Sequence, residues 1–206
     1  MPNARAAPAA RQAMEKMKES AMLNLHALWA HSRANGPGTR MVLWFQGCTL
    51  GCPGCFNPAT HAPEPRWQVS VEEIMGRIMT EGCAIDGITL SGGEPLQQPE
   101  ALLELLCAIR AQTNLSVLLF SGYTMAEIEH LPLGPAILTQ VDVLIAGRYV
   151  QTKHLARGLR GSANKTVHLL TDRYILDDID QVPEGEVWIE ADGTVVISGI
   201  EPPFHS

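Results

Sequence analysis

Three cysteines in this chain have a spacing that could do chemistry. Cys48, Cys52 and Cys55 lie within eight residues, with three residues between the first two and two between the last two. Cysteine thiolates hold iron–sulfur clusters, and a 4Fe-4S cluster normally takes four of them, one for each iron. No fourth cysteine lies within reach. One iron would therefore stay open to a ligand that the protein does not supply, which indicates a reactive cluster.

A zinc site is the nearest alternative for these thiols. With His61 the three cysteines form a C-x3-C-x2-C-x5-H pattern, which could bind structural zinc. Their setting argues against this alternative, because they follow the apolar run 41–45 and so lie on a loop that leaves a buried strand. Structural zinc more often stabilises small modules that lack a core.

The remaining cysteines do not suggest a second site. A disulfide framework is disfavoured because five cysteines are an odd number and no secretory signal precedes them. Cys83 and Cys107 are isolated, and each falls in or just beyond an apolar helical face. We expect both to be small core residues.

Length and composition predict a cytoplasmic enzyme with one domain. The chain has 206 residues, of which 46% are hydrophobic, enough for a substantial core. Its net charge of -7 argues against nonspecific binding of nucleic acid, which depends on clustered Lys and Arg. No apolar stretch approaches the ~20 residues that a membrane span requires, and no signal peptide is recognisable. We expect neither a nucleic acid nor a membrane as a partner.

Strand patterns and helix patterns alternate along the chain. Most expected strands are too apolar for a half-exposed sheet and should be buried on both faces. They cover residues 41–45, 87–90, 116–120, 141–146 and 166–170. Helices should begin after Ser70, which forms a capping box with Glu73, at Pro99, and after Thr124, which forms a second box with Glu127. This order predicts an α/β fold with right-handed crossovers and a largely parallel sheet.

The two ends of the chain depart from this alternation. Residues 23–30 alternate like a strand, whereas the methionines and alanines before residue 21 favour a helix. Residues 186–190 and 194–198 flank Ala191-Asp192-Gly193 and predict a C-terminal β-hairpin at the sheet edge. The expected divisions are an N-terminal extension at 1–22, the main domain at 23–171 and a tail with the hairpin at 172–206.

A glycine-rich turn should share the rim with the cysteine loop. Gly92, Gly93 and Glu94 follow the expected strand 87–90, at its carboxyl end. Glycines there let bare backbone groups approach the ammonium and carboxylate of a ligand. Taken alone the motif reads as a tight turn with Glu94 in solvent, but its place beside the cysteines favours binding. Ser121 ends the next strand and could bind a ribose, although it also fits an ordinary loop before a capped helix.

These residues resemble the radical S-adenosylmethionine enzymes. They are most similar to the small activases of anaerobic ribonucleotide reductase and, more distantly, to the pyruvate formate-lyase activating enzyme. The shared motifs occur in the family's order across roughly residues 23–170. They are Asn35-Gly36-Pro37-Gly38-Thr39-Arg40, Gln46-Gly47-Cys48, Cys52-Pro53-Gly54-Cys55-Phe56-Asn57, Leu90-Ser91-Gly92-Gly93-Glu94-Pro95, Ser121-Gly122-Tyr123, Asp142-Val143-Leu144 and Arg160-Gly161-Ser162-Ala163-Asn164.

The resemblance implies a partial (βα)6-type barrel in which Cys48, Cys52 and Cys55 hold one 4Fe-4S cluster at the top rim. S-adenosylmethionine would bind the open iron through its amino and carboxylate groups, and its reductive cleavage would give a 5'-deoxyadenosyl radical. The implied cofactor contacts are Gly54, Cys55 and Phe56 near the adenine, Gly92 and Gly93 at the methionine amino group, Glu94, and Ser121 near the ribose. By this reasoning Gly93→Val should weaken cosubstrate binding and spare the cluster.

The same resemblance implies partners. They are a glycyl radical enzyme, such as anaerobic ribonucleotide reductase, and a flavodoxin- or ferredoxin-type reductant. Asn164, in a Gly-Ser-x-Asn turn, is a candidate for docking a substrate or partner, or only for forming the turn. Gly54 stands where many radical S-adenosylmethionine enzymes carry an aromatic residue, so adenine stacking would fall to Phe56. No second cysteine cluster lies between Cys55 and Gly92, so the activases that carry a ferredoxin domain are a poor match.

Three functions therefore compete. The first is an activase that takes a hydrogen atom from a backbone glycine of a partner enzyme. The second is a radical catalyst that modifies a small molecule or peptide, with the tail as a lid. The third is a non-catalytic zinc or electron-transfer protein. The tail after about residue 171 exceeds the smallest activases, and sequence does not decide between the first two functions.

Overall fold

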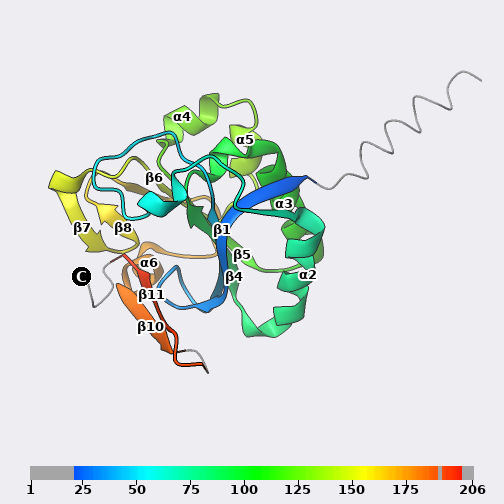
Figure 1. Cartoon of the computed structure of the whole chain (residues 1–206). Helices are drawn as coiled ribbons and strands as arrows, with labels where there is room; N and C mark the ends of the chain where they lie inside the picture. Colours follow the sequence, from blue (N-terminus) through cyan, green and yellow to red (C-terminus); the bar gives the residue numbers. More distant parts are fainter. Residues whose placement is uncertain (1–20, 190–191, 201–206) are drawn as a thin grey trace, which may run out of the picture.

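A seven-stranded sheet forms the centre of the protein (Figure 1). The structure is a computed structural model that describes residues 21–189 and 192–200. In spatial order the strands are β3 (Trp67–Ser70), β1 (Met22–Ser32), β2 (Arg40–Phe45), β4 (Gly87–Gly92), β5 (Ser116–Ser121), β6 (Val143–Ala146) and β9 (Thr166–Leu169). The four strands β2, β4, β5 and β6 are parallel, whereas β3, β1 and β9 are antiparallel to their neighbours. The expected α/β fold with a largely parallel sheet is confirmed.

Helices cover one face of this sheet (Figure 1). They are α2 (Val71–Glu81), α3 (Pro99–Gln112), α4 (Met125–His130) and α5 (Gly134–Leu138). Side chains alternate along each strand, so Met41 and Leu43 of β2 point into the core shared with the helices. The predicted caps are present: the Ser70 hydroxyl accepts a hydrogen bond from the Glu73 amide at 3.1 Å, and Thr124 forms a reciprocal capping box. The helix starts thus follow from local sequence.

A buried arginine fills the other face near the amino ends of the parallel strands. The Arg40 side chain is fully buried. Its guanidinium donates to the Thr89 hydroxyl at 2.7 Å, the Ser116 hydroxyl at 2.8 Å and the Ile88 carbonyl at 2.7 Å. The Tyr174 hydroxyl, from the segment before α6 (Leu176–Asp180), lies 2.7 Å from the Ser116 hydroxyl. We call this group the arginine floor.

Two small sheets lie beside the central sheet. One pairs β7 (His154–Arg157) with β8 (Arg160–Ser162), and the other is the predicted hairpin of β10 (Gly185–Ile189) and β11 (Val195–Gly199). Single 3-10 turns occur at η1 (Pro58–Thr60), η2 (Gly82–Ala84), η3 (Pro95–Gln97) and η4 (Gln151–Lys153). The helix expected before residue 21 lies outside the described residues, as do Glu190 and Ala191 of the expected hairpin. Among the described residues, no helix has the length and apolar character needed to cross a bilayer.

The prediction for the two isolated cysteines was wrong. Cys83 and Cys107 are exposed rather than part of the core. On α3 the buried side chains include Leu105, Leu106 and Ile109, and the helix turns Cys107 away from that face. Cys83 comes directly after the C-cap Gly82, where the chain has already left α2.

Candidate iron–sulfur site

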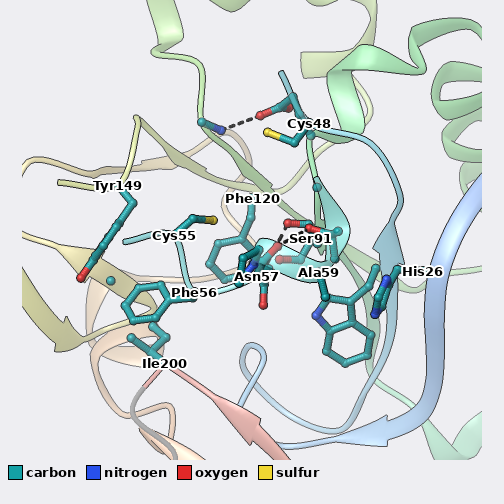
Figure 2. Close-up of a pocket in the computed structure, with 18 of the residues that line it drawn as sticks. His26, Cys48, Cys55, Phe56, Asn57, Ala59, Ser91, Phe120, Tyr149 and Ile200 are labelled. Atoms are coloured by element: carbon teal, nitrogen blue, oxygen red, sulfur yellow. Dashed lines mark hydrogen bonds between the residues drawn. The ribbon is translucent and has the colours of Figure 1, made fainter. Parts of the chain in front are cut away.

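The carboxyl ends of the parallel strands open onto one cavity of about 590 Å³. Cys48, Cys52 and Cys55 all line this cavity. Figure 2 shows the sulfur atoms of Cys48 and Cys55 facing the interior of the cavity, with Phe120 of β5 and Ser91 of β4 beside them. The sheet therefore places the predicted thiols at the rim where its parallel strands end.

Main-chain hydrogen bonds hold the cysteine loop at both sides. The Gly47 amide donates to the Thr60 carbonyl at 2.7 Å, and the Cys48 amide donates to the His61 carbonyl at 3.1 Å. On the other side, the Gln97 side chain accepts a bond from the Thr49 amide at 3.1 Å. Burial raises the pKa of the Cys48 thiol. The loop is thus fixed by backbone contacts that leave its sulfur atoms directed at the cavity.

The thiols fit a cluster better than a single ion. Within the described residues, no three His, Cys, Asp or Glu side chains are gathered so that they could hold one metal ion. The Cys3His zinc set with His61 is therefore not assembled. A 4Fe-4S cluster instead takes its thiolates on separate iron atoms, so thiols spread around a cavity suit it. The other two cysteines, Cys83 in η2 and Cys107 in α3, are exposed, do not line the cavity and supply no fourth ligand.

The paired glycines after β4 are packed against the cysteine loop. A Cβ on Gly93 would overlap the carbonyl oxygen of Gly47, and a Cβ on Gly92 would lie 2.6 Å from the Phe45 amide nitrogen. Gly92 also has φ +98°, in the region that favours glycine. The Gly93 amide donates to the Phe45 carbonyl at 2.8 Å. Both glycines line the cavity, but their bare Cα atoms also serve close packing, which the sequence did not reveal.

Glu94 joins two rim loops from a buried position. Only 1% of its surface is exposed, so the alternative of a solvated Glu94 is wrong. Its carboxylate accepts hydrogen bonds from the Ser121 hydroxyl at 2.9 Å, the Gly122 amide at 2.7 Å and the Leu96 amide at 3.1 Å. Burial raises the pKa of Glu94 to about 7, although these three bonds lower it. The carboxylate thereby fixes the loop after β5 relative to the loop after β4.

Lys165 brings a positive charge to the same cavity. Its ammonium donates to the Gly147 carbonyl and lines the cavity wall. Burial lowers the pKa of Lys165, whereas the negative charges of Glu94, Cys52 and Cys55 act to raise it. Lys165 directly follows Asn164 of the Gly-Ser-x-Asn turn, and that position was the signal that could have identified it.

Asn164 itself does not line the cavity. Its side-chain amide donates to the Arg148 carbonyl at 2.9 Å, and its Oδ1 atom is buried without a hydrogen-bond partner. The bond to Arg148 is a cross-link within the fold, in line with the turn-forming alternative. Docking of a substrate or partner by Asn164 stays a prediction.

Aromatic side chains form the wall below Cys55 (Figure 2). The Phe56 ring lies 4.5 Å from the Tyr149 ring and 5.8 Å from the His154 ring, between centroids. Gly54 does not line the cavity, and a Cβ there would lie 2.8 Å from the Gln151 side chain. Of the three residues expected near an adenine, Cys55 and Phe56 line the cavity and Gly54 does not.

Sequence reasoning missed the far side of the cavity. Trp29 and Trp44 line it from β1 and β2, with ring centroids 4.8 Å apart in an edge-to-face arrangement. Ile197, Ser198, Gly199 and Ile200 line it from the C-terminal hairpin and the residue after it. Trp44 lay inside an apolar run that reads only as a buried strand, and no local pattern indicates where a hairpin packs.

Comparison with known proteins gives a family and several relatives. Residues 34–168 match the family model of a 4Fe-4S single cluster domain. The anaerobic ribonucleoside-triphosphate reductase-activating proteins of Vibrio cholerae and Escherichia coli are each 32% identical to this chain, over 72% of this chain and 99% of those proteins. The protein of that name from Pasteurella multocida is 33% identical, over 66% of this chain and 91% of its own length. Among solved structures, QueE from Escherichia coli aligns with a TM-score of 0.42 and 16% identity over 50% of this chain and 53% of that chain.

Proposed function

We propose a function from one premise: this chain belongs to the radical S-adenosylmethionine activases, the family that includes the anaerobic ribonucleoside-triphosphate reductase-activating proteins. The chain is an enzyme that installs a glycyl radical on a partner. Its partner, we infer, is an anaerobic ribonucleotide reductase, and its reductant a flavodoxin- or ferredoxin-type protein. One observation carries the proposal: among the described residues, three thiols and no fourth line one cavity at the rim of the sheet.

Three cysteine thiols would be the protein ligands of the cluster. Cys48, Cys52 and Cys55 would ligate one 4Fe-4S cluster, whose fourth iron stays free for S-adenosylmethionine. A bound and reduced cluster would supply one electron for the cleavage of S-adenosylmethionine to methionine and a 5'-deoxyadenosyl radical, and this radical would take a hydrogen atom from a glycine Cα of the partner.

The protein's own residues orient and shield these groups. Gly92 and Gly93 present backbone at the cavity wall, and Phe56 offers an aromatic face for the adenine. Lys165 lines the same cavity as Cys52 and Cys55, so its positive charge would offset the negative charge of their thiolates. Glu94 is occupied by three protein hydrogen bonds and so acts by holding the Ser121 loop in place.

Anaerobic reconstitution tests the proposal. The protein would be loaded with iron and sulfide, reduced, and supplied with S-adenosylmethionine, with and without an anaerobic ribonucleotide reductase. We expect 5'-deoxyadenosine in both cases and a stable glycyl doublet in the spin-resonance spectrum only when the reductase is present.

Cysteine variants provide the control. Cys48→Ala should abolish both signals because it removes a cluster ligand, whereas Cys107→Ala should retain both because Cys107 is exposed and does not line the cavity. Full activity in Cys48→Ala would refute the ligand assignment. Production of 5'-deoxyadenosine without any glycyl radical would instead indicate a different substrate.

A further inference from the structure

One face of the C-terminal hairpin is apolar and exposed. Val187 pairs with Ile197 and Ile189 pairs with Val195 across the two strands, so these four side chains share one face. Their exposed fractions are 40% for Val187, 36% for Ile197, 74% for Ile189 and 55% for Val195. We call these four residues the hairpin strip. Contiguous exposed apolar residues of this kind mark interaction sites.

The hairpin strip begins at the cavity and leads away from it. Ile197 lines the cavity that contains the three cysteines, as do the residues 198–200 that follow it. Figure 2 shows Ile200 next to Phe56. Ile189 and Val195, at the other end of the strip, do not line the cavity. The strip therefore forms a continuous apolar path from the site of chemistry to the outer surface.

At the end opposite its turn, the hairpin is fixed to the end of β1 and the residues that follow it. The Glu186 carboxylate accepts hydrogen bonds from the Arg33 amide at 2.8 Å and from the Ser32 hydroxyl. The Ser198 hydroxyl accepts one from the Asn35 side chain at 2.7 Å. These polar contacts lie on the opposite face of the hairpin from the strip, since Glu186 and Ser198 pair with each other in the register. The strip is thus held in a defined position, and all four of its side chains are at least 36% exposed.

We propose that the hairpin strip is a docking surface for the segment of the partner protein that carries the target glycine. The inference rests on the proposed function, because it requires a polypeptide that reaches the cavity from outside. A small molecule held in the cavity would touch Ile197 but would leave Ile189 and Val195 without a role. The hairpin also lies outside residues 34–168, the part that matches the 4Fe-4S family model. The hairpin follows the matched region in the chain and forms a two-stranded sheet of its own, apart from the central sheet.

A double variant at the outer end of the strip tests the proposal. Ile189→Thr with Val195→Thr keeps β-branched side chains, which suit strands, but removes apolar surface. Binding would be measured anaerobically by calorimetry against the purified anaerobic ribonucleotide reductase of the same organism. We expect a dissociation constant about tenfold higher and a lower yield of glycyl radical at limiting reductase. Cleavage of S-adenosylmethionine without the reductase should equal that of the wild type, because neither residue lines the cavity.

Controls separate this proposal from its alternatives. Met79→Gln replaces an exposed apolar residue of α2, 54% exposed, and should leave binding unchanged. Should the double variant lose its secondary structure by circular dichroism, the single variant Ile189→Lys serves instead, since a side chain with 74% exposure accepts a charge.

Unchanged affinity in a folded strip variant would overturn the docking proposal. So would a change from dimer to monomer in sedimentation with unchanged affinity for the reductase, because the strip would then join two copies of this chain. Failure of the wild-type protein to cleave S-adenosylmethionine without the reductase would count against the proposed function itself. Cleavage by a wild-type protein that does not bind the reductase would contradict the inferred partner as well as the docking proposal. A folded strip variant that binds the reductase as tightly as the wild type would contradict the docking proposal alone.

Discussion

Replacing Gly93 by alanine would show whether the glycine pair supports the cysteine loop. The new Cβ would overlap the Gly47 carbonyl oxygen and lie 2.9 Å from the Gly47 carbonyl carbon. Ordinary contact begins at 3.4 Å, so that carbon must retreat by about 0.5 Å. Gly93 does not have a positive φ, so alanine adds a steric effect without a backbone penalty.

The retreat would act directly on a cluster ligand. The Gly47 carbonyl accepts a hydrogen bond from the Glu94 amide at 2.9 Å, and Cys48 is the next residue. Forcing extra volume into a packed site typically costs about 1–3 kcal/mol, and weakening this bond contributes about 1 kcal/mol of that. We therefore expect Gly93→Ala to lose about 1–3 kcal/mol of stability and to bind its cluster incompletely. This differs from the sequence-based expectation that a larger residue here would spare the cluster.

Two measurements check this expectation. Urea unfolding of the apoprotein gives the loss of stability, and iron and sulfide analysis after reconstitution gives the cluster content. Gly76→Ala is the matched control, because Gly76 lies in α2 with no atom within 4 Å of an added Cβ. That control should gain roughly 0.5–1 kcal/mol. A Gly93→Ala protein with wild-type stability and a full cluster would refute the reasoning.

Two further predictions concern the ion pairs of Asp142 and Glu127. Asp142→Ala should lower the free energy of unfolding in urea by about 2 kcal/mol. The substitution leaves the Val117 amide, which donates to Asp142 at 2.7 Å, without its acceptor and removes the ion-pair partner of Arg110. An unchanged unfolding midpoint would contradict this prediction. Glu127→Gln should cost at most about 1 kcal/mol at pH 7, because its pair with Arg148 is 40% exposed or more. The hydrogen bond from Arg148 is the main cause that lowers the pKa of Glu127 to about 2. The stabilisation of the folded state by this pair is therefore fully present above pH about 4.5 and is lost as the pH falls toward 2. A Glu127→Gln penalty that grows with falling pH would show the sign to be wrong.

Local sequence predicted the parallel centre of the fold because each of its signals acts within a few residues. The run 41–45 is apolar enough to be buried on both faces, and it forms β2. Ser70 and Thr124 cap the helices that follow them. The antiparallel strand β3 was not predicted, because its four residues pair with β1 more than forty positions earlier in the chain. Such non-local pairing leaves little trace in so short a segment.

The candidate site was predictable where chemistry dictates residue type. The spacing of Cys48, Cys52 and Cys55 is enough to predict a cluster held by three thiols, and the three side chains line one cavity. Glu94 could not be interpreted in the same way, because its role depends on the Gly122 amide and on burial, which only the fold creates. The contacts with S-adenosylmethionine and the division at residue 171 stay predictions.

The arginine floor has a consequence for how this architecture can change over time. A planar guanidinium bonds only in fixed directions, so Arg40 locks β2 against β4 and β5 and prevents one strand from sliding past another. Through the Ser116 and Tyr174 hydroxyls the same lock fastens the start of the tail. This hydrogen-bond network lies near the amino ends of the parallel strands, at the opposite end of the sheet from the cysteines. Loops above it, and extensions beyond Tyr174, can be exchanged for new recognition tasks without loosening the frame that carries the metal ligands.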